Sequence, residues 1–437
     1  LQCSQRIRKS GAYYFKLYGF RQSGGVEKEI GFRVVSNKLW MVSELYYPEA
    51  TSTGYILTQI AEGLATKDFV VNVLCSQPTY SSRGVYAPKK EVHNGVEIWR
   101  CWGTTLNKDI LFFRLINLVT ITMSLFVNAL WHIKRFDKVL VVTNPPSLPY
   151  FISFSCWLCR ANCILLIHDL YPNLLVAVGK LRLRSLLTRL MHAINKIMFK
   201  TLKHVIVIGR DMRDLIAGSF SKAEVTVITN WSDSRDIVPM PKEHNILLSE
   251  YRLKDKFILQ YAGNIGYPND VESIVESATQ LSNEDGIYFL FIGAGTKKKW
   301  LVAEVTKRAQ KNILILPSRV REDQVNFLNA CDVALVSLVD GMKGISVPSR
   351  IYNILAAGKP IIAITEKATE LAFVVEEENI GWVVPPHDPK ALVKVIREAY
   401  ANQDQLAAMG ARARKAAEEK YAFECKLQAF QTLLQNL

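Results

Sequence analysis

Short apolar runs of strand length recur along the chain and alternate with longer stretches that have helical spacing. In the first half these runs predict strands at 39–43, 70–74, 96–100, 139–142, 164–167, 205–208 and 225–228. In the second half they predict strands at 257–261, 288–292, 313–316, 333–336, 361–364 and 381–384. Strands that alternate with helices indicate a parallel sheet covered by helices on both faces. The pattern therefore predicts an α/β protein.

A polar connector at 233–253 separates the two series of strands. A chain of 437 residues is long enough for two or three domains, and we expect two doubly wound domains, at 38–236 and 237–420. Sheets of this kind bind ligands at the carboxyl ends of their strands, so we expect a site in the cleft between the domains. Residues 421–437 keep helical apolar spacing and predict a closing helix that returns to the N-terminal domain. Residues 1–37 are a basic tail of unassigned role, without the apolar stretch of a secretory signal.

Two apolar segments, 115–133 and 139–159, are long enough to span a membrane. The second is broken by Asn144-Pro145-Pro146 and Pro149, which favours a strand, a turn and a helix because proline disrupts a helix interior. For the first segment we expect a helix over about 111–131. Two interpretations stay open for it: a helix that rests on or dips into a membrane surface, and an ordinary buried helix.

The basic residues are concentrated in the first half. The chain has 54 Lys or Arg and 40 Asp or Glu, a formal net charge of +14, and all of the excess precedes Met240. The stretch 173–204 contains no acidic residue, and its Lys and Arg are interleaved with apolar residues. This pattern predicts a basic amphipathic helix, which is typical of proteins at anionic membrane surfaces; a solvated face over a packed core is the alternative.

The sequence does not support nucleic acid as a partner, because the chain has no recognisable binding module and no basic surface interleaved with aromatic residues.

Eight cysteines are too few for a disulfide scaffold, and Cys156, Cys159 and Cys163 lack the neighbouring ligands of a zinc site. We therefore expect a reducing, cytoplasmic compartment and no metal site.

Glycine-rich turns follow predicted strands at Gly54, at 263–266 and at Gly293-Ala294-Gly295. A turn without side chains lets backbone N–H groups approach a phosphate closely. Neither Gly-x-Gly-x-x-Gly nor the nucleotide-hydrolysing P-loop motif occurs, which argues against a dinucleotide site and against an ATPase.

The segment 341–362 has the most specific pattern in the chain. It predicts a loop, a short helix that opens near Ser349, a glycine at its end and a strand. A serine N-cap followed by Arg350 would offer N–H groups and a guanidinium that binds phosphate through two parallel bonds.

This segment resembles the donor-binding stretch of family 4 glycosyltransferases, which are retaining enzymes with the GT-B fold of two Rossmann-like domains facing across a cleft. The resemblance runs from about Lys38 to the C-terminus and is closest to the subgroup that builds colanic acid, O-antigen and other exopolysaccharides. It also rests on an ordered series of shorter matches: Tyr47-Pro48-Glu49, Thr53-Gly54, 168–172, Thr229-Asn230-Trp231, 261–266, 291–295 and 330–336.

The resemblance implies a role for most of the matched residues. Ser349 and Arg350 would hold the diphosphate of the donor, and Arg350 would stabilise the charge that develops on it. Donor-binding positions are implied at Gly54, Gly263, Asn264, Gly266, Gly293 and Gly295.

Position along the chain, and not the resemblance, marks His168 and Asp169 as catalytic candidates: they follow the predicted strand at 164–167, so they should enter the cleft from the N-terminal side and orient the acceptor or a proton. A histidine satisfied by local hydrogen bonds is the alternative for His168. Glu49, in the first strand-to-helix loop, is another candidate on the acceptor side.

The chain departs from the family pattern in two places. Two glutamates eight positions apart are frequent in the family, but Ile345 and Asn353 stand at the aligned positions; Asn353 can still hydrogen-bond a ribose hydroxyl. Many members of the family place a basic pair after the first glycine of the cleft, and this pair is missing here, since Asn264 and Asn269 stand in that area. Arg350, Arg319 or Lys343 are the candidates to replace the missing positive charge.

We therefore expect a retaining glycosyltransferase that moves a sugar from a UDP- or GDP-sugar to a lipid-linked or saccharide acceptor in bacterial surface polysaccharide synthesis. The chain has no Asp-x-Asp, so we expect no metal, and no cofactor besides the nucleotide-sugar substrate. The basic N-terminal half predicts a peripheral protein on the cytoplasmic face of the inner membrane. Two alternatives are a catalytically weakened nucleotide-sugar-binding or membrane scaffold, and a nucleotide-sugar epimerase of the same fold.

Overall fold

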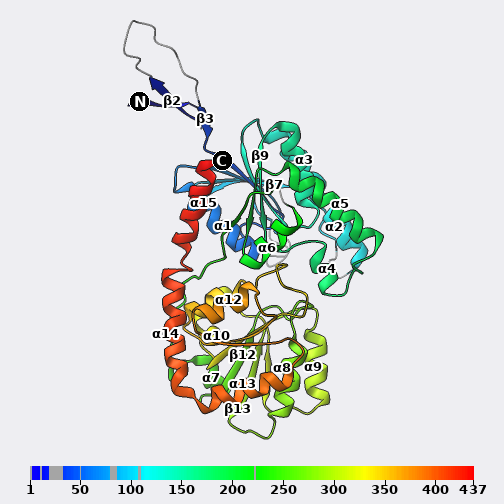
Figure 1. The fold of residues 1–437 in the computed structure, drawn as a ribbon, viewed down its shortest axis with the longest axis vertical. Helices are drawn as coiled ribbons and strands as arrows, with labels where there is room; N and C mark the ends of the chain where they lie inside the picture. Colours follow the sequence, from blue (N-terminus) through cyan, green and yellow to red (C-terminus); the bar gives the residue numbers. More distant parts are fainter. Residues whose placement is uncertain are drawn as a thin grey trace.

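Two β-sheets with helices on both faces form the two halves of the molecule (Figure 1). The structure is a computed structural model that describes residues 2–9, 12–18, 33–49, 51–78, 86–106, 110–220 and 223–437. The alternation of strands and helices predicted from the sequence is confirmed, and most strand boundaries agree within one or two residues.

The N-terminal domain contains an eight-stranded sheet in the order β11-β10-β9-β8-β4-β5-β7-β6, in which β6 alone is antiparallel to its neighbour. Its strands are β4 (Lys38–Val42), β5 (Val70–Ser76), β6 (Lys90–His93), β7 (Val96–Cys101), β8 (Lys138–Val142), β9 (Asn162–Ile167), β10 (His204–Val207) and β11 (Val225–Val227). Its helices are α1 (Ser52–Ala65), α2 (Leu111–His132), α3 (Leu148–Cys159), α4 (Asn173–Ala177), α5 (Leu186–Thr201) and α6 (Arg210–Ser219). A separate antiparallel sheet joins β1 (Gln2–Lys9), β2 (Ala12–Tyr18) and β3 (Arg33–Ser36).

The C-terminal domain contains a parallel six-stranded sheet in the order β14-β13-β12-β15-β16-β17. Every residue of β12 is buried, as expected for a strand covered on both faces. The strands are β12 (Phe257–Ala262), β13 (Ile287–Ile292), β14 (Ile313–Leu316), β15 (Val333–Ser337), β16 (Ile361–Ile364) and β17 (Gly381–Val384). The helices are η1 (Lys242–His244), α7 (Ile246–Glu250), α8 (Val271–Gln280), α9 (Lys298–Lys307), η2 (Arg321–Asp323), α10 (Gln324–Leu328), α11 (Arg350–Ala356), α12 (Glu370–Glu377), α13 (Pro389–Ala401), α14 (Gln403–Glu419) and α15 (Phe423–Asn436).

The prediction of a single helix over 173–204 is wrong. The structure has two helices there, α4 and α5, and α5 begins where the Ser185 hydroxyl accepts a hydrogen bond from the Thr188 amide. A serine N-cap of this kind marks a new helix start. Within the described residues, α2 is the one helix that is long and apolar enough to cross a membrane, over Phe112–His132.

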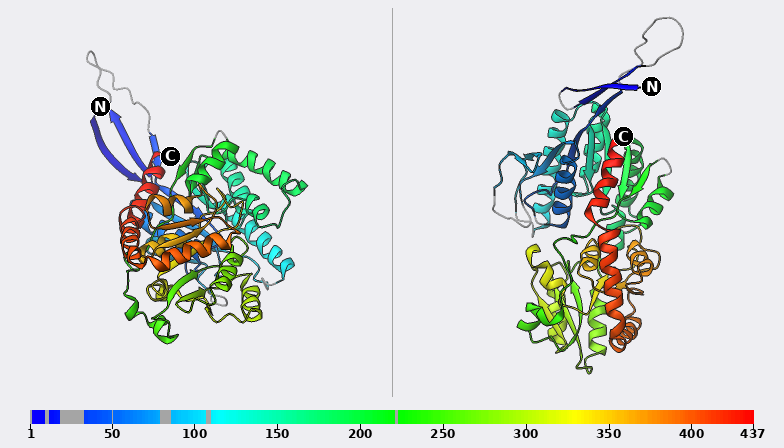
Figure 2. Two further views of the ribbon diagram at one scale, coloured as in Figure 1. Left: turned by 60° about the horizontal axis from the view of Figure 1, so that its bottom comes forward. Right: turned by 90° about the vertical axis from the view of Figure 1, so that its left-hand side faces the viewer.

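The last two helices run along one side of both domains (Figure 2). Helix α14 packs against α11 of the C-terminal domain, and α15 packs against α1 of the N-terminal domain. Gly63 permits the second contact, because a Cβ at this position would lie 2.8 Å from the Leu427 side chain. Arg414 of α14 anchors the connection between the domains by donating to the carbonyl oxygens of Ile237, Ala356 and Ser234 at 2.6–2.9 Å.

Replacing Arg414 by methionine should lower the free energy of unfolding by about 2–4 kcal/mol, because three partly buried carbonyl groups lose a charged donor. Urea denaturation followed by circular dichroism measures the change. Arg412→Met is the matched control, since Arg412 makes one exposed bond, to the carbonyl of Asn379. Equal effects of the two substitutions would contradict the anchoring role.

Candidate active site

The two domains meet where loops at the carboxyl ends of their strands face each other. The loop after β9 pairs with the 341–347 loop of the C-terminal domain: the Leu170 amide donates to the Ile345 carbonyl at 2.9 Å, and Asp169 forms a backbone bridge with Ser346. The Ser52 and Ser349 hydroxyls also lie 3.0 Å apart, although they belong to different domains. This contact region is the cleft in which the sequence places the site.

Arg350 packs against the first glycine turn of the C-terminal domain. Its guanidinium lies 4.4 Å from the centre of the Tyr261 ring and donates to the side-chain oxygen of Asn269 at 3.0 Å. Gly263 has φ +146, and a Cβ there would lie 2.5 Å from Nη1 of Arg350. The guanidinium therefore occupies the area in which the basic pair of the family is missing.

The two other candidate cations do not share this position. Arg319 pairs with Asp323 at 3.3 Å, and Lys343 lies exposed on the 341–347 loop. Arg350 is thus the candidate that the fold brings to the turn at 263–266.

The second glycine turn packs on the first. A Cβ on Gly293 would lie 1.9 Å from the Gly263 carbonyl oxygen, and one on Gly295 would lie 2.3 Å from the Ile265 carbonyl oxygen. A Cβ on Gly266 would lie 2.8 Å from the side-chain nitrogen of Asn264. Close approach of two backbone segments therefore explains Gly293 and Gly295 without a bound phosphate.

The N-terminus of α1 contributes Gly54 from the other domain. Its amide donates to the Thr51 hydroxyl at 3.2 Å, and a Cβ there would lie 2.8 Å from the Glu49 carbonyl oxygen. Glu49, predicted on the acceptor side, is buried. Ser349 stands at the N-cap position of α11 as expected, but the expected capping bond is absent, because Ser349 has helical backbone angles and its hydroxyl contacts Ser52 instead.

His168 and Asp169 extend from the end of β9, where the Thr143 hydroxyl accepts bonds from both of their backbone amides. Nε2 of His168 is enclosed and has no hydrogen-bond partner among the described residues. Burial lowers the pKa of His168 to about 4, so the ring is neutral at pH 7. Burial also raises the pKa of Asp169, and a side-chain hydrogen bond with Ser346 partly opposes that increase.

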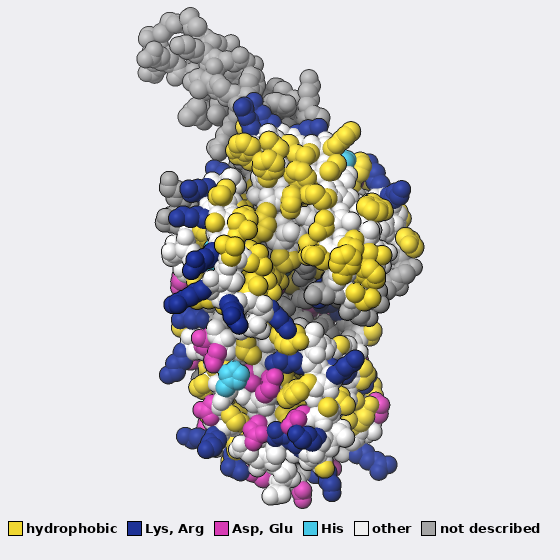
Figure 3. Space-filling view, turned by 90° about the vertical axis from the view of Figure 1, so that its right-hand side faces the viewer, with side chains coloured by type: hydrophobic (Ala, Val, Ile, Leu, Met, Phe, Trp, Pro, Cys, Tyr) yellow, Lys and Arg dark blue, Asp and Glu magenta, His cyan; other side chains and the backbone are white. Residues whose placement is uncertain are grey.

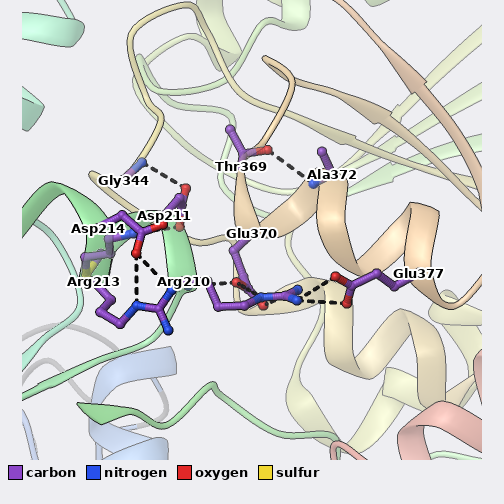
Figure 4. Close-up of polar contacts among 10 residues, drawn as sticks. Arg210, Asp211, Arg213, Asp214, Gly344, Thr369, Glu370, Ala372 and Glu377 are labelled. Carbon is purple, nitrogen blue, oxygen red and sulfur yellow. Dashed lines mark hydrogen bonds and ion pairs between the residues drawn. The ribbon is translucent and has the colours of Figure 1, made fainter. Parts of the chain in front are cut away.

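A set of charged contacts that sequence reasoning missed joins α6 to the C-terminal domain (Figure 4). Arg210 donates to the carboxylates of Glu370 at 2.9 Å and Glu377 at 2.6 Å. The neighbouring Asp211 accepts the Gly344 amide at 2.8 Å. These partners are more than 130 positions apart in the sequence, so no local spacing signal could have paired them.

Asn353 takes part in a second missed network. Its side-chain oxygen accepts the Asp233 amide at 3.1 Å, while the Asp233 carboxylate accepts from Arg321 at 2.7 Å and from the Tyr55 hydroxyl at 3.1 Å. Arg321 also stacks 3.3 Å above the Tyr55 ring. The residue in place of the second glutamate therefore binds the connector between the domains, and Ile345, in place of the first, is buried.

Comparisons with known proteins decide the family. Residues 53–231 match the family model described as "Glycosyl transferase 4-like domain", and residues 247–416 match "Glycosyl transferases group 1". WbjE of Pseudomonas aeruginosa, named as a glycosyltransferase, is 34% identical over 316 residues, or 70% of this chain and 76% of that protein. The chain belongs to the group 1 glycosyltransferases. The resemblance and the enzyme class predicted from the sequence are confirmed.

Two further comparisons place the glycosyltransferase among its relatives. WcaI of Escherichia coli (strain K12), named as a colanic acid biosynthesis glycosyl transferase, is 25% identical over 81% of this chain and 90% of that protein. The crystal structure of HepE from Anabaena in complex with UDP matches with a TM-score of 0.67 at 14% identity, over 92% of this chain and 100% of that chain. The predicted GT-B fold of two Rossmann-like domains is confirmed.

The neutral state of His168 predicts a pH dependence of stability. The free energy of unfolding of the glycosyltransferase should fall as the pH is lowered from about 6.5 towards about 4, because the unfolded chain takes up a proton that the folded protein excludes. His168→Gln should reduce this slope, measured by urea denaturation at several pH values. The exposed His244 supplies the control His244→Gln. An unchanged slope in His168→Gln would rule out the assignment.

Proposed function

We propose that this glycosyltransferase moves a hexosyl group from a UDP- or GDP-sugar to a lipid-linked or saccharide acceptor, with retention of anomeric configuration and without a metal ion. The observation that carries the proposal is the position of Arg350 against Gly263 and Asn269. The Arg350 guanidinium supplies a positive charge at the turn 263–266, where the family's basic pair is absent. This turn lies in the cleft that α1 enters from the N-terminal domain.

The leaving nucleoside diphosphate gains negative charge as the glycosidic bond breaks. A guanidinium binds phosphate oxygens through two parallel bonds, and α1 directs a positive helix end toward the cleft. Groups that are already oriented toward developing charge stabilise the transition state. Metal independence is part of the proposal, since the chain has no Asp-x-Asp and Arg350 would neutralise the diphosphate.

The acceptor is assigned to the N-terminal side of the cleft, next to His168 and Asp169. Nε2 of the neutral His168 has no partner among the described residues, and it would hydrogen-bond an acceptor hydroxyl once acceptor binding gives that hydroxyl access to the enclosed atom. Asp169 would orient the hydroxyl. Support for a nucleotide-sugar donor comes from HepE, whose structures hold UDP and UDP-glucose. Support for surface polysaccharide synthesis comes from the name of WcaI.

Calorimetric titration with UDP and with GDP, each with and without magnesium, tests the donor site. Arg350→Ala should weaken binding of the preferred nucleotide by about 1.5–3 kcal/mol, the range for a hydrogen bond to a charged group. Arg308→Ala is the matched control, because Arg308, at the end of α9, pairs with Glu276 of α8 and Glu304 of α9 and has no contact with Arg350. An unchanged affinity in Arg350→Ala would remove Arg350 from the site.

Each outcome of the titration discriminates between functions. Binding of one nucleotide without dependence on magnesium supports the proposed donor site, whereas binding only with magnesium contradicts metal independence. Failure of both nucleotides to bind would favour a scaffold without donor chemistry, because Ile345 and Asn353 replace the glutamates. With a donor and acceptor in hand, the NMR coupling of the product's anomeric proton reports retention or inversion.

The proposed location is the cytoplasmic face of the inner membrane. Arg182, Arg184, Arg189, Lys196 and Lys200 are all exposed on or just before α5. Each Lys or Arg near an anionic surface contributes about 1 kcal/mol to binding. The basic side chains of α5 would thus bring the acceptor side of the enzyme to anionic lipid headgroups.

Replacing Arg182, Arg184 and Arg189 together by glutamine should weaken binding to vesicles that contain anionic phospholipid by about a hundredfold at low salt. Vesicle co-sedimentation measures this change. Glutamine at the exposed Lys299, Lys307 and Lys311 of the C-terminal domain is a control of equal charge. Equal loss in both triple variants would show that net charge alone, and not this surface, governs binding.

A further inference from the structure

Helix α5 buries two polar side chains beside Met198 and Phe199, and it exposes several apolar ones. Thr188 is 0% and Asn195 is 3% exposed, whereas Leu186 is 83% and Ile197 is 67% exposed. Helices on the surface of a domain in water normally show the opposite arrangement. The outward side of α5 is therefore suited to an apolar environment.

The two neighbouring helices share this property. In α3, Ser155 is buried while Trp157 is 61% exposed; in α2, Asn117 is buried while Phe112 and Trp131 are 66% and 76% exposed. Each of these helices also buries apolar residues, such as Met198 and Phe199 of α5 and Leu125 of α2, so α5 and α2 carry apolar side chains on two sides.

The exposed apolar side chains form one continuous surface, because α2 packs beside α3 and α3 packs beside α5. Phe126 of α2 stacks on Phe154 of α3 with ring centres 6.3 Å apart. Figure 3 shows this side of the molecule, with apolar side chains spread over the N-terminal domain and Lys and Arg beside them. We call it the three-helix face, and it consists of Phe112, Leu115, Val119, Met123, Val127, Trp131, Phe154, Trp157, Leu158, Leu186, Leu187, Leu190, Ile194 and Ile197.

Charge decides which partner fits the three-helix face. Residues 110–210 contain thirteen Lys or Arg and two acids, Asp137, which is buried, and Asp169, which lies in the cleft. A second copy of the chain on this face would bring two basic surfaces together, which repel each other. An anionic bilayer offers both hydrocarbon for the apolar side chains and negative headgroups for the basic residues around them.

We infer that the three-helix face inserts into the hydrocarbon of an anionic bilayer, with α2, α3 and α5 lying along the membrane. This inference rests on the proposed membrane location and deepens it, because apolar side chains that enter the hydrocarbon would then hold the protein on the membrane in addition to the attraction between charges. Helix α2 stays with its domain in this arrangement: Asn117 donates to the Leu106 carbonyl at 2.8 Å, and the Thr122 and Ser147 hydroxyls lie 2.8 Å apart.

Insertion would also position the acceptor loop. Asn195 of α5 donates to the carbonyl of Tyr171 at 2.7 Å and accepts from the Tyr150 hydroxyl of α3 at 2.9 Å. Tyr171 is two residues beyond Asp169, so the buried side of the membrane-facing helices holds the loop that carries Asp169. A lipid-linked acceptor anchored in the same bilayer would reach the cleft from this side.

Vesicle flotation at low salt and in 1 M NaCl separates insertion from attraction between charges. At 1 M salt the screening length is about 3 Å, which removes most electrostatic binding. The wild-type protein should remain on vesicles of phosphatidylcholine and phosphatidylglycerol in 1 M NaCl. The triple variant Leu187→Gln, Leu190→Gln, Ile197→Gln should bind about a thousandfold or more weakly, because each lost apolar side chain removes more than tenfold in partitioning.

The control replaces exposed apolar residues of the other domain, Ile246→Gln with Val302→Gln, and should bind as the wild type does. All replaced side chains are exposed, so circular dichroism and nucleotide titration without vesicles should be unchanged, which keeps this test separate from that of donor binding. Complete elution of the wild type by 1 M NaCl, or equal binding of the triple variant, would overturn the inference.

The depth to which the three-helix face inserts is measured with vesicles of phospholipids whose acyl chains carry bromine, because bromine quenches the fluorescence of nearby tryptophan. Quenching should decrease in Trp131→Phe and in Trp157→Phe, and should not decrease in Trp300→Phe of the C-terminal domain. Quenching that is the same in all three variants, or a stable dimer without lipid that the triple variant abolishes, would contradict insertion and assign the face to other contacts.

Discussion

The Gly344 amide donates across the cleft to the carboxylate of Asp211, and the arrangement of the site depends on this contact between domains. Burial raises the pKa of Asp211, and hydrogen bonds from backbone amides stabilise its charged form. Beside it, Arg210 holds Glu370 and Glu377 of α12. Because a buried charge without a partner is costly, these contacts favour one relative position of the two domains.

The fixed 341–347 loop leads directly into α11, and Arg350 begins that helix. The same loop pairs with the residues after β9 that include Asp169. Donor-side and acceptor-side candidates are therefore held by one set of contacts, although they come from different sheets. Any motion that opened the cleft would have to break the Asp211 and Arg210 contacts together with the pairing of Leu170 and Ile345.

The cleft and the three-helix face are built on the same strands and helices of the N-terminal domain. Helices α3 and α5 follow the strands β8 and β9, whose ends also carry Thr143 and His168. Asn195 links the two regions by a partly buried hydrogen bond to Tyr171. A transfer reaction at a membrane needs the acceptor loop near the lipid, and this connectivity supplies that proximity.

The sequence by itself determined the α/β class, the family and thirteen of the seventeen strands that the structure describes, because apolar periodicity and the order of short motifs are local properties of a chain. It also marked Arg350, His168 and Asp169 as candidates. It missed β1, β2, β3 and β6. It could not pair Arg210 with Glu370 or Asp233 with Asn353 and Arg321, since these contacts join positions about 90 to 160 apart. Nor could it show that Thr188 and Asn195 face inward while Leu186 and Ile197 face outward. The side that a helix presents to its neighbours is fixed only when the helix packs in the tertiary structure. The three-helix face is a result of that packing.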